Sequence, residues 1–234
     1  MTLIVGLVGR DGIVLAADSR GTARDSGGIL AMNDQEKKLL KLTNNAGMAL
    51  SGELGIARTL IDRRLHDAED CPVESIACVD RLVDDLSTHF WETFSRPFQK
   101  VHPPAWPSVN LIVAGYNECH DPRLYTMTLG SGGFFPHLEE GVGYVFNGVP
   151  HYASLIASVL YHHDLSIHSL SRLAAFMISE TAAQHPTVGG PIRIATITPD
   201  NGYVELPDDV VVLICQRNNE QRNKLRIVFF EGDV

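Results

Sequence analysis

Three side chains near the start of the chain have the types that nucleophilic catalysis needs: Thr2, Asp18 and Lys38. A threonine hydroxyl is a poor nucleophile until a neighbouring base takes its proton. Removal of Met1 would expose the α-amine of Thr2, whose reference pKa of about 7.7–8.0 suits it to accept that proton near neutral pH. A lysine nearby disfavours protonation of this amine, and a carboxylate keeps the lysine charged in a partly apolar site. We therefore interpret Thr2 as a candidate nucleophile, with Lys38 and Asp18 as its partners.

Two predicted strands must position the first two of these residues. Residues 2–9 form an apolar run without clean alternation, which is typical of a strand buried on both faces. Residues 13–17 form a second apolar strand that ends at Asp18. Asp11 and Gly12 between the strands tolerate positive φ and predict a two-residue hairpin turn.

This turn creates a geometric difficulty for the candidate site. An ideal two-residue turn pairs Thr2 with Gly21 and places Asp18 on the opposite face of the sheet from Thr2. The three side chains then meet only if Lys38 bridges the other two, or if a bulge re-aims the end of the second strand.

Lys38 lies within a strand predicted over residues 36–42. Alternation places it on the same face as Leu40 and Leu42, and a lysine on such an apolar face calls for an explanation. A simpler interpretation is that its aliphatic stem lines the edge of the core while its amine reaches water. Asp18 has a similar alternative as the cap of a strand end. We favour the catalytic interpretation because the residue types occur together.

The rest of the chain alternates between strand and helix patterns. The glycine-rich, polar segment from Gly21 to Asp34 is predicted to be a loop. Two apolar runs, 210–214 and 225–230, flank a polar stretch, and a helix followed by a strand is one interpretation there. Further strands are predicted over residues 48–51, 109–115, 124–129, 142–146, 192–198 and 203–206, and helices over residues 56–65, 76–90, 155–160 and 170–178.

The order of these elements predicts an α+β fold. Paired helices between groups of hairpin-connected strands favour a four-layer αββα sandwich, in which two stacked antiparallel sheets are flanked by helix pairs. We expect residues 1–234 to form a single domain, with the residues after about 207 as a C-terminal extension.

Composition narrows the classes of partner. The chain has 234 residues and a formal net charge of −9, so neither nucleic acid nor a membrane is expected as its main partner. Its four cysteines form no C-x-x-C pair and no metal-ligand spacing, which predicts reduced thiols in a cytoplasmic protein. The apolar N-terminal run is interrupted by glycines and by Arg10, unlike a signal peptide. We expect no metal and no cofactor.

Several short segments of the chain, including those with Thr2, Asp18 and Lys38, resemble a known family. The chain resembles the β-type subunits of the proteasome and the HslV-type peptidases, which are N-terminal-nucleophile (Ntn) hydrolases. No helical extension precedes the first strand, so the chain looks like a β-type subunit, and a bacterial proteasome homologue without a propeptide beyond Met1 describes it best. The matching segments are residues 2–6, residues 11–20 with Thr22, residues 37–39, residues 51–52 and the hairpin over 194–206.

The resemblance implies roles for individual positions. It places the nucleophile, aspartate and lysine of the family at Thr2, Asp18 and Lys38, and makes the backbone N–H of Gly52 an oxyanion donor. Arg20 falls on a supporting position. The positions that would bind an extended substrate are Gly21, Thr22, Glu36, Leu50 and Leu54. Of these, Leu50 suggests a pocket for an apolar side chain, and Glu36 suggests that a basic one is admitted.

The chain departs from the family pattern at the accessory residues that orient the terminal amine. Asn147 stands near the position of a serine, and His185 and Val188 stand where an aspartate and a serine belong. An asparagine can still form hydrogen bonds and a histidine can partly replace a carboxylate, but a valine cannot. Thr187, one residue away, is a substitute if the loop shifts.

The resemblance implies a threonine-type endopeptidase of a self-compartmentalising ring, acting on peptides or unfolded proteins. Such an enzyme would be a homo-oligomer in stacked rings, open to an ATPase or other activator. Two alternatives stay open. One is a catalytically weak or inactive ring or scaffold protein of the same fold, and the other is an Ntn amidohydrolase that acts on a small amide.

Overall fold

The computed structural model describes residues 2–25, 28–66, 73, 76–95, 107–117, 120–130 and 133–231. Met1, whose removal is part of the predicted chemistry, lies outside these residues, as do Cys71 and Cys119. None of the described helices combines the length and apolar character that a membrane span needs.

The described strands form two five-stranded antiparallel sheets and a separate two-stranded ribbon, as the sequence led us to expect for the two sheets. The first sheet has the order β10-β1-β2-β11-β12, and its strands are β1 (Leu3–Val8), β2 (Ile13–Ala17), β10 (Tyr144–Gly148), β11 (Arg193–Thr198) and β12 (Gly202–Glu205). The second has the order β5-β6-β7-β8-β9, and its strands are β5 (Leu39–Lys41), β6 (Ala46–Gly52), β7 (Val109–Tyr116), β8 (Pro122–Gly130) and β9 (Gly133–Leu138). The ribbon consists of β3 (Gly21–Asp25) and β4 (Gly28–Asn33).

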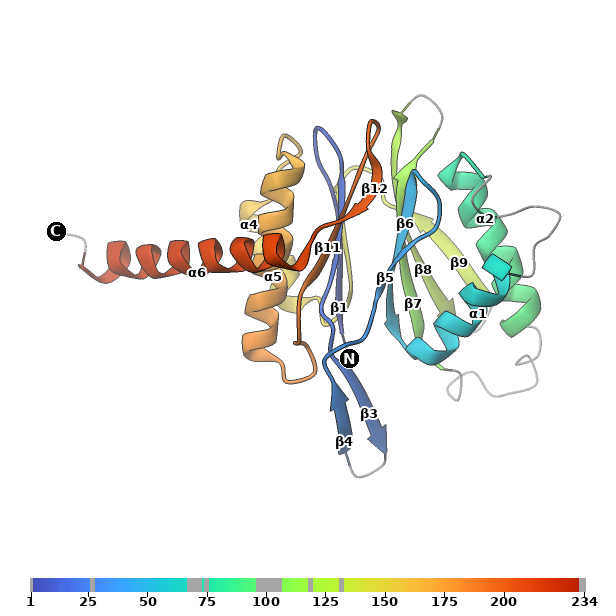
Figure 1. The fold of residues 1–234 in the computed structure, drawn as a ribbon, viewed down its shortest axis with the longest axis horizontal. Coiled ribbons are helices and arrows are strands. Elements are labelled where there is room, and N and C mark those ends of the chain that lie inside the picture. The colour runs from blue at the N-terminus through green and yellow to red at the C-terminus, as the bar shows by residue number, and fades with distance from the viewer. Residues whose placement is uncertain are drawn as a thin grey trace.

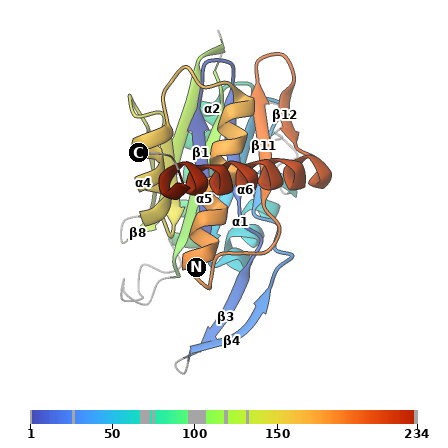
Figure 2. The same ribbon diagram turned by 90° about the vertical axis from the view of Figure 1, so that its left-hand side faces the viewer.

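Five α-helices are described, and they lie on the outer sides of the two sheets (Figure 1). α4 and α5 flank the first sheet, whereas α1 and α2 flank the second. α6 crosses α5 and projects away from the body of the molecule, as the second view also indicates (Figure 2). The helices are α1 (Leu54–His66), α2 (Val79–Phe90) with a π-helical turn η2 (Trp91–Ser95), α4 (His151–Leu160), α5 (Ile167–Gln184) and α6 (Asp208–Glu231).

Three clusters of buried apolar side chains hold these elements together. One joins the two sheets face to face and includes Ile4, Leu15 and Ile112. A second lies between the β6–β7–β8 face and α1 and α2, and a third lies between the first sheet and α4, α5 and α6. Every residue of β2 is buried, which explains why its sequence shows no alternation.

The connection between β1 and β2 differs from the predicted two-residue turn. Val8 pairs with Ile13, so residues 9–12 form a four-residue loop. The side chain of Asp11 accepts a hydrogen bond from the backbone N–H of Ile167 at 2.7 Å, at the first turn of α5. The predicted turn at Asp11 and Gly12 is therefore wrong: the N–H of Gly9 donates to the carbonyl oxygen of Gly12 at 2.9 Å, which closes the loop around Arg10 and Asp11, and the Asp11 carboxylate satisfies a backbone donor at the start of α5.

The segment from Gly21 to Asp34, predicted to be a loop, is instead the β3–β4 ribbon. Gly21 pairs with Asn33 and Thr22 with Met32, with a register shift between Ala23 and Arg24. Its glycine-rich, polar sequence resembles a loop because this ribbon projects from the body instead of lying in a core (Figure 1). The pairing brings Arg20 and Asp34 side by side at the base of the ribbon.

Two further elements escaped the sequence patterns. β9 is an edge strand that contains Pro136, and proline is tolerated at an edge because one side of the strand needs no ladder donor. Residues 208–231 form one continuous helix, α6, and not a helix followed by a strand.

The apolar stripe of α4 faces outward. Ala153 and Ala157 of α4 are buried and Ile156 is half-buried against the same cluster, whereas Leu155 and Val159 are 66% and 73% exposed. Small alanines on the inner face suit a close approach of α4 to its neighbours, so the larger side chains lie on the opposite face. Packing in the core of a single chain therefore does not explain why these large apolar side chains are exposed.

Candidate functional site

Thr2 lies directly before β1, between the ends of β10 and β2. Its carbonyl oxygen accepts a hydrogen bond from the N–H of Val149 at 2.9 Å, and its side chain is buried. Gly148 has a φ of +94°, and a Cβ at this position would lie 1.7 Å from the Thr2 carbonyl oxygen. Glycine is therefore required for β10 to hold Thr2 so closely.

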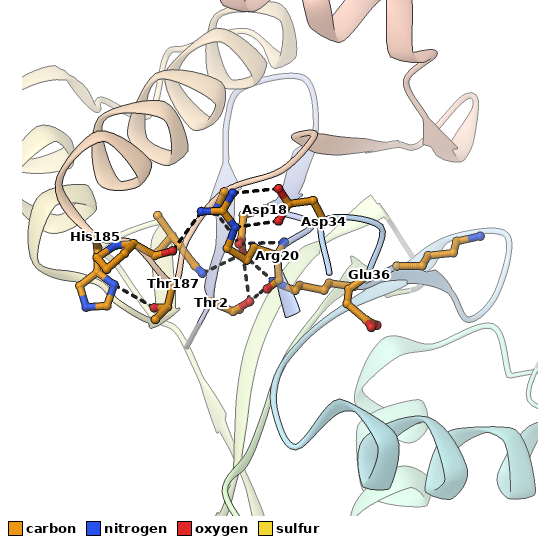
Figure 3. A network of polar contacts seen from close by, with 12 residues as sticks. Thr2, Asp18, Arg20, Asp34, Glu36, His185 and Thr187 are labelled. Atoms are coloured by element: carbon orange, nitrogen blue, oxygen red, sulfur yellow. Dashed lines mark hydrogen bonds and ion pairs between the residues drawn. The ribbon is translucent and has the colours of Figure 1, made fainter. Parts of the chain in front are cut away.

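The three residues predicted to do chemistry meet in one hydrogen-bonded network (Figure 3). The Thr2 hydroxyl donates to Oδ1 of Asp18 at 3.0 Å. The Lys38 amine donates to the same carboxylate oxygen at 2.8 Å and is in hydrogen-bond contact with the Thr2 hydroxyl. It also donates to the carbonyl oxygen of Arg20 at 2.7 Å. The predicted bridging by Lys38 is present, and Asp18 also reaches Thr2 directly.

The geometric difficulty disappears because Thr2 and Asp18 both lie beyond the paired part of their strands. β1 begins at Leu3 and β2 ends at Ala17; past that point the N–H of Asp18 still donates to the Leu3 carbonyl oxygen at 3.3 Å, but the Asp18 side chain departs from the alternation of the strand. Asp18 turns back toward β1, where its Oδ1 accepts from the N–H of Leu3 at 3.1 Å. Its Oδ2 accepts from the N–H of Arg20 at 3.2 Å and of Gly189 at 3.0 Å.

Burial shapes the electrostatics of this network. The side chains of Lys38 and Asp18 are fully buried, and the simpler interpretation of Lys38 as a lysine that reaches water is wrong. Burial lowers the pKa of the Lys38 amine, because the charged form loses its hydration, and this outweighs the opposing effect of Asp18. A lysine with a lowered pKa more readily takes its neutral form, which can accept a proton from a hydroxyl that it contacts.

The predicted oxyanion and apolar pocket positions follow along β6 into α1. Gly52 ends β6 with a φ of +92°, and a Cβ there would lie 2.0 Å from the carbonyl oxygen of Ser108. Leu50 is buried against the α1 and α2 layer, and its N–H donates to the carbonyl oxygen of Lys38 at 2.9 Å. Leu54 is half-buried in the first turn of α1.

The other three predicted substrate positions lie at the base of the β3–β4 ribbon. Gly21 and Thr22 open β3, and a Cβ at Gly21 would lie 2.6 Å from Cγ of Glu36. The carboxylate of Glu36 forms an ion pair of 2.9 Å with Arg58. Its negative charge is therefore already paired, which weakens the expectation that it attracts a basic side chain.

The departures at the accessory positions have structural explanations. Val188 is fully buried in the cluster beneath α5, so this position packs in the core. The neighbouring Thr187 is 1% exposed, and its hydroxyl forms a 2.8 Å hydrogen bond with Nδ1 of His185. Asn147 is adjacent in sequence to Gly148 and accepts from its N–H at 2.7 Å, and it lies 3.4 Å from the hydroxyl of Ser51 across the two sheets.

Two residues of this region were missed by sequence reasoning. Asp34 binds the guanidinium of Arg20 through both oxygens, at 2.7 and 2.8 Å. Gly189 supplies a backbone donor to Asp18. Pairing of β3 with β4 would have placed Asp34 beside Arg20, but residues 21–34 were predicted to be a loop. In the part of the chain that the structure describes, no group of three His, Cys, Asp or Glu side chains could hold a metal ion.

The fold and the site together consist of two antiparallel sheets and a buried Thr–Asp–Lys network at the start of the first strand. Comparison with known proteins shows which family has these features. Residues 2–197 match the family described as "Proteasome subunit". The chain therefore belongs to the proteasome subunit family.

Relatives and solved structures agree with this assignment. The chain is 30% identical over 210 residues to proteasome subunit beta 2 of Aeropyrum pernix, covering 87% of this chain and 84% of that one. It is 26% identical over 215 residues to proteasome subunit beta of Methanopyrus kandleri, covering 90% and 93%. These matches confirm the resemblance to β-type subunits.

Solved structures of bacterial Anbu proteins share the fold. The Anbu complex from Pseudomonas aeruginosa, described as a helical assembly, matches with a TM-score of 0.80 at 16% identity, covering 99% of this chain and 97% of that one. An Anbu mutant from Hyphomicrobium sp. strain MC1 matches with a TM-score of 0.75 at 19% identity, covering 100% and 99%.

The lowered pKa of Lys38 yields a prediction that does not depend on activity. Nuclear magnetic resonance of the lysine side chains should show Lys38 titrating below the ordinary value of about 10.4, identified by the signal that Lys38→Met removes. Asp18→Asn should lower this pKa further, because the Asp18 carboxylate favours the charged amine. Asp121→Asn, a surface change, should leave it unaltered. A pKa of Lys38 that is ordinary, or that rises in Asp18→Asn, would contradict this description of the site.

Proposed function

We propose that the protein is a threonine-type endopeptidase of a proteasome-like ring, with Thr2 as its nucleophile once Met1 is removed. The observation that carries this proposal is the buried network in which the Thr2 hydroxyl contacts both Lys38 and Asp18. Membership of the proteasome subunit family supports the same chemistry.

In the proposed reaction, Oγ1 of Thr2 attacks the carbonyl carbon of a peptide bond. Its proton passes to a neighbouring amine, either that of Lys38, which it contacts, or the free α-amine of Thr2. The same proton then goes to the leaving nitrogen as the C–N bond breaks, which leaves an ester on Thr2. Water hydrolyses this ester and restores the hydroxyl. Asp18 stabilises the protonated amine during these steps.

The substrate would lie extended beside β3 and β6. Gly52 would donate its N–H to the oxyanion, and Gly21 and Thr22 would contact the substrate backbone. Leu50 and Leu54 favour an apolar side chain before the scissile bond, and the ion pair of Glu36 with Arg58 supports that preference.

The accessory residues would support the site from behind. Arg20 would hold the loop next to Asp18, and His185 would act with Thr187, whose hydroxyl it binds. Asn147 would connect the end of β10 to Ser51 near the oxyanion position.

The larger organisation is also part of the proposal. Residues 1–234 would form one Ntn-hydrolase domain with a four-layer αββα sandwich, extended by α6 after about residue 207. Three separate core clusters, one between the sheets and one beneath each helix layer, support this arrangement. The protein would work in the cytoplasm, where enclosure of the site in stacked rings protects other proteins and where an ATPase or other activator could deliver unfolded substrates.

Exposed apolar surface supports a homo-oligomer. Phe229 and Phe230, near the end of α6, are 76% and 84% exposed and together present on the order of 300 Å² of apolar surface. Leu155 and Val159 of α4 are also exposed, and a groove of about 570 Å³ lies between α5 and α6. Exposed apolar surface of this extent is typical of an interface between proteins.

A scaffold function is the second candidate, because Val188 occupies a position where the family has a hydroxyl and is buried in the core. It shares the fold and the oligomer with the first proposal and differs in having no reactive threonine. Covalent labelling therefore separates the two candidates.

Intact-mass spectrometry with an electrophilic lactone or epoxyketone tests the proposed nucleophile. The wild-type chain should have lost Met1 and should gain the mass of one inhibitor. Thr2→Ala should abolish labelling because the attacking hydroxyl is gone, and Lys38→Ala because the hydroxyl loses the amine that it contacts in the site. Thr126→Ala and Lys41→Ala are matched controls that should label normally. A wild-type mass that retains Met1 and gains no inhibitor would refute the peptidase proposal.

The apolar end of α6 makes a prediction about assembly. Phe229→Glu combined with Phe230→Glu should reduce the mass measured by light scattering toward that of a single 25.7 kDa chain. The change places two charges in what we propose to be a buried contact. Gln216→Glu with Asn219→Glu adds the same charge to exposed polar positions of α6 and should leave the mass unchanged. Equal masses for the wild type and the phenylalanine variant would exclude this surface from the interface.

A further inference from the structure

The guanidinium of Arg20 joins the end of the second strand to the base of the β3–β4 ribbon and to the distant loop after α5 (Figure 3). Its Nε and Nη2 donate to the two oxygens of Asp34 at 2.7 and 2.8 Å, a bidentate arrangement. Its Nη1 donates to the carbonyl oxygen of Pro186 at 3.0 Å. We call this set of contacts the Arg20 clasp. Bidentate pairs fix orientation as well as distance, because the planar guanidinium matches the carboxylate.

The clasp packs closely against the loop that follows α5. A Cβ at Gly189 would lie 2.6 Å from Cζ of Arg20, so the guanidinium lies against the backbone of that residue. Gly190 has a φ of +73°, and a Cβ there would lie 3.0 Å from Asp34. Both glycines therefore allow the loop to approach the ion pair more closely than other residues could.

This loop in turn holds Asp18. The N–H of Gly189 donates to Oδ2 of Asp18 at 3.0 Å, and the carbonyl oxygen of Gly189 accepts from the N–H of Ser19 at 3.0 Å. The N–H of Arg20 is the second donor to the same Oδ2. Both donors to this oxygen thus come from residues that the clasp positions, while the other oxygen, Oδ1, contacts Thr2 and Lys38.

We infer that Asp34 is a positioning residue, which acts through Arg20 and Gly189 to hold the carboxylate of Asp18 in the orientation that serves Thr2 and Lys38. This inference rests on the proposed function. Arg20 and Asp34 also favour each other's charged forms, since the pKa of the Asp34 carboxyl is lowered mainly by its hydrogen bond with Arg20. Without the carboxylate of Asp34, Arg20 keeps its contact with Pro186 but loses the partner that fixes its plane.

The effect on reaction follows from orientation. A displacement of reacting groups by about 1 Å can cost about a hundredfold in rate. Asp34 lies at the base of the ribbon, two residues before Glu36, and is half-exposed, so its removal should leave the apolar core unchanged. We therefore expect slower chemistry in its absence with little change in inhibitor affinity.

The test measures labelling of the full chain by the epoxyketone over a range of concentrations. Asp34→Asn should lower the labelling rate at saturation about tenfold or more, with little change in the concentration that gives half the maximal rate. Asp34→Glu retains a carboxylate and should recover part of the rate. Asp121→Asn is the matched control, since Asp121 forms a 2.7 Å ion pair with Arg123 on the surface and should not affect labelling.

Hydrogen exchange at the Gly189 amide provides a readout that does not require activity. The exchange should be faster in Asp34→Asn than in the wild type and unchanged in Asp121→Asn. A labelled wild type with an equally fast Asp34→Asn variant, or an unchanged Gly189 exchange rate, would overturn the inference while leaving the proposed function intact. A wild type that has lost Met1 and does not label would instead overturn the proposed function.

Discussion

A fully buried ion pair between Lys38 and Asp18 is the constraint on which the rest of the site depends. Removal of two charges from water costs several kcal/mol per ion unless hydrogen bonds and the partner charge compensate. Compensation comes here from backbone N–H groups of Leu3, Arg20 and Gly189 on the carboxylate, and from the carbonyl oxygen of Arg20 on the amine. The first strand, the end of the second strand and the loop after α5 must all be in place before the pair can be buried.

The stacking of the two sheets brings the three residues of the candidate site together. Thr2 and Asp18 belong to the ends of strands in the first sheet, whereas Lys38 directly precedes β5 of the second. The apolar cluster between the sheets, which includes Ile4 and Leu39, brings Lys38 against the other two residues. Core packing and site geometry are therefore linked, because a change that separates the sheets also separates Lys38 from Thr2 and Asp18.

Residue types and periodicity were sufficient to find the centre of the site, but not its supports. Thr2, Asp18 and Lys38 could be proposed from chemistry because a lysine on an apolar face is unusual and the three residue types together suit one reaction. Asp34 could not, because its role depends on the pairing of Gly21 with Asn33 in a ribbon whose composition resembles a loop. The contribution of Gly189 was equally hidden, since a backbone donor leaves no trace in the side-chain pattern. The outward stripe of α4 shows the same limit, because periodicity identifies an apolar face without saying what covers it.

In the proposed reaction, the Thr2 hydroxyl forms a covalent ester with the acyl part of its substrate. The most direct test of this ester is to mix protein that begins at Thr2 with an apolar peptide ester. Alcohol release and intact mass are then followed together. If Thr2 is the nucleophile, a burst of alcohol equal to the number of chains should appear together with a transient species heavier by one acyl group, located on Thr2 by fragmentation. Protein that begins at Thr2 and gives neither the burst nor the acylated species would contradict it.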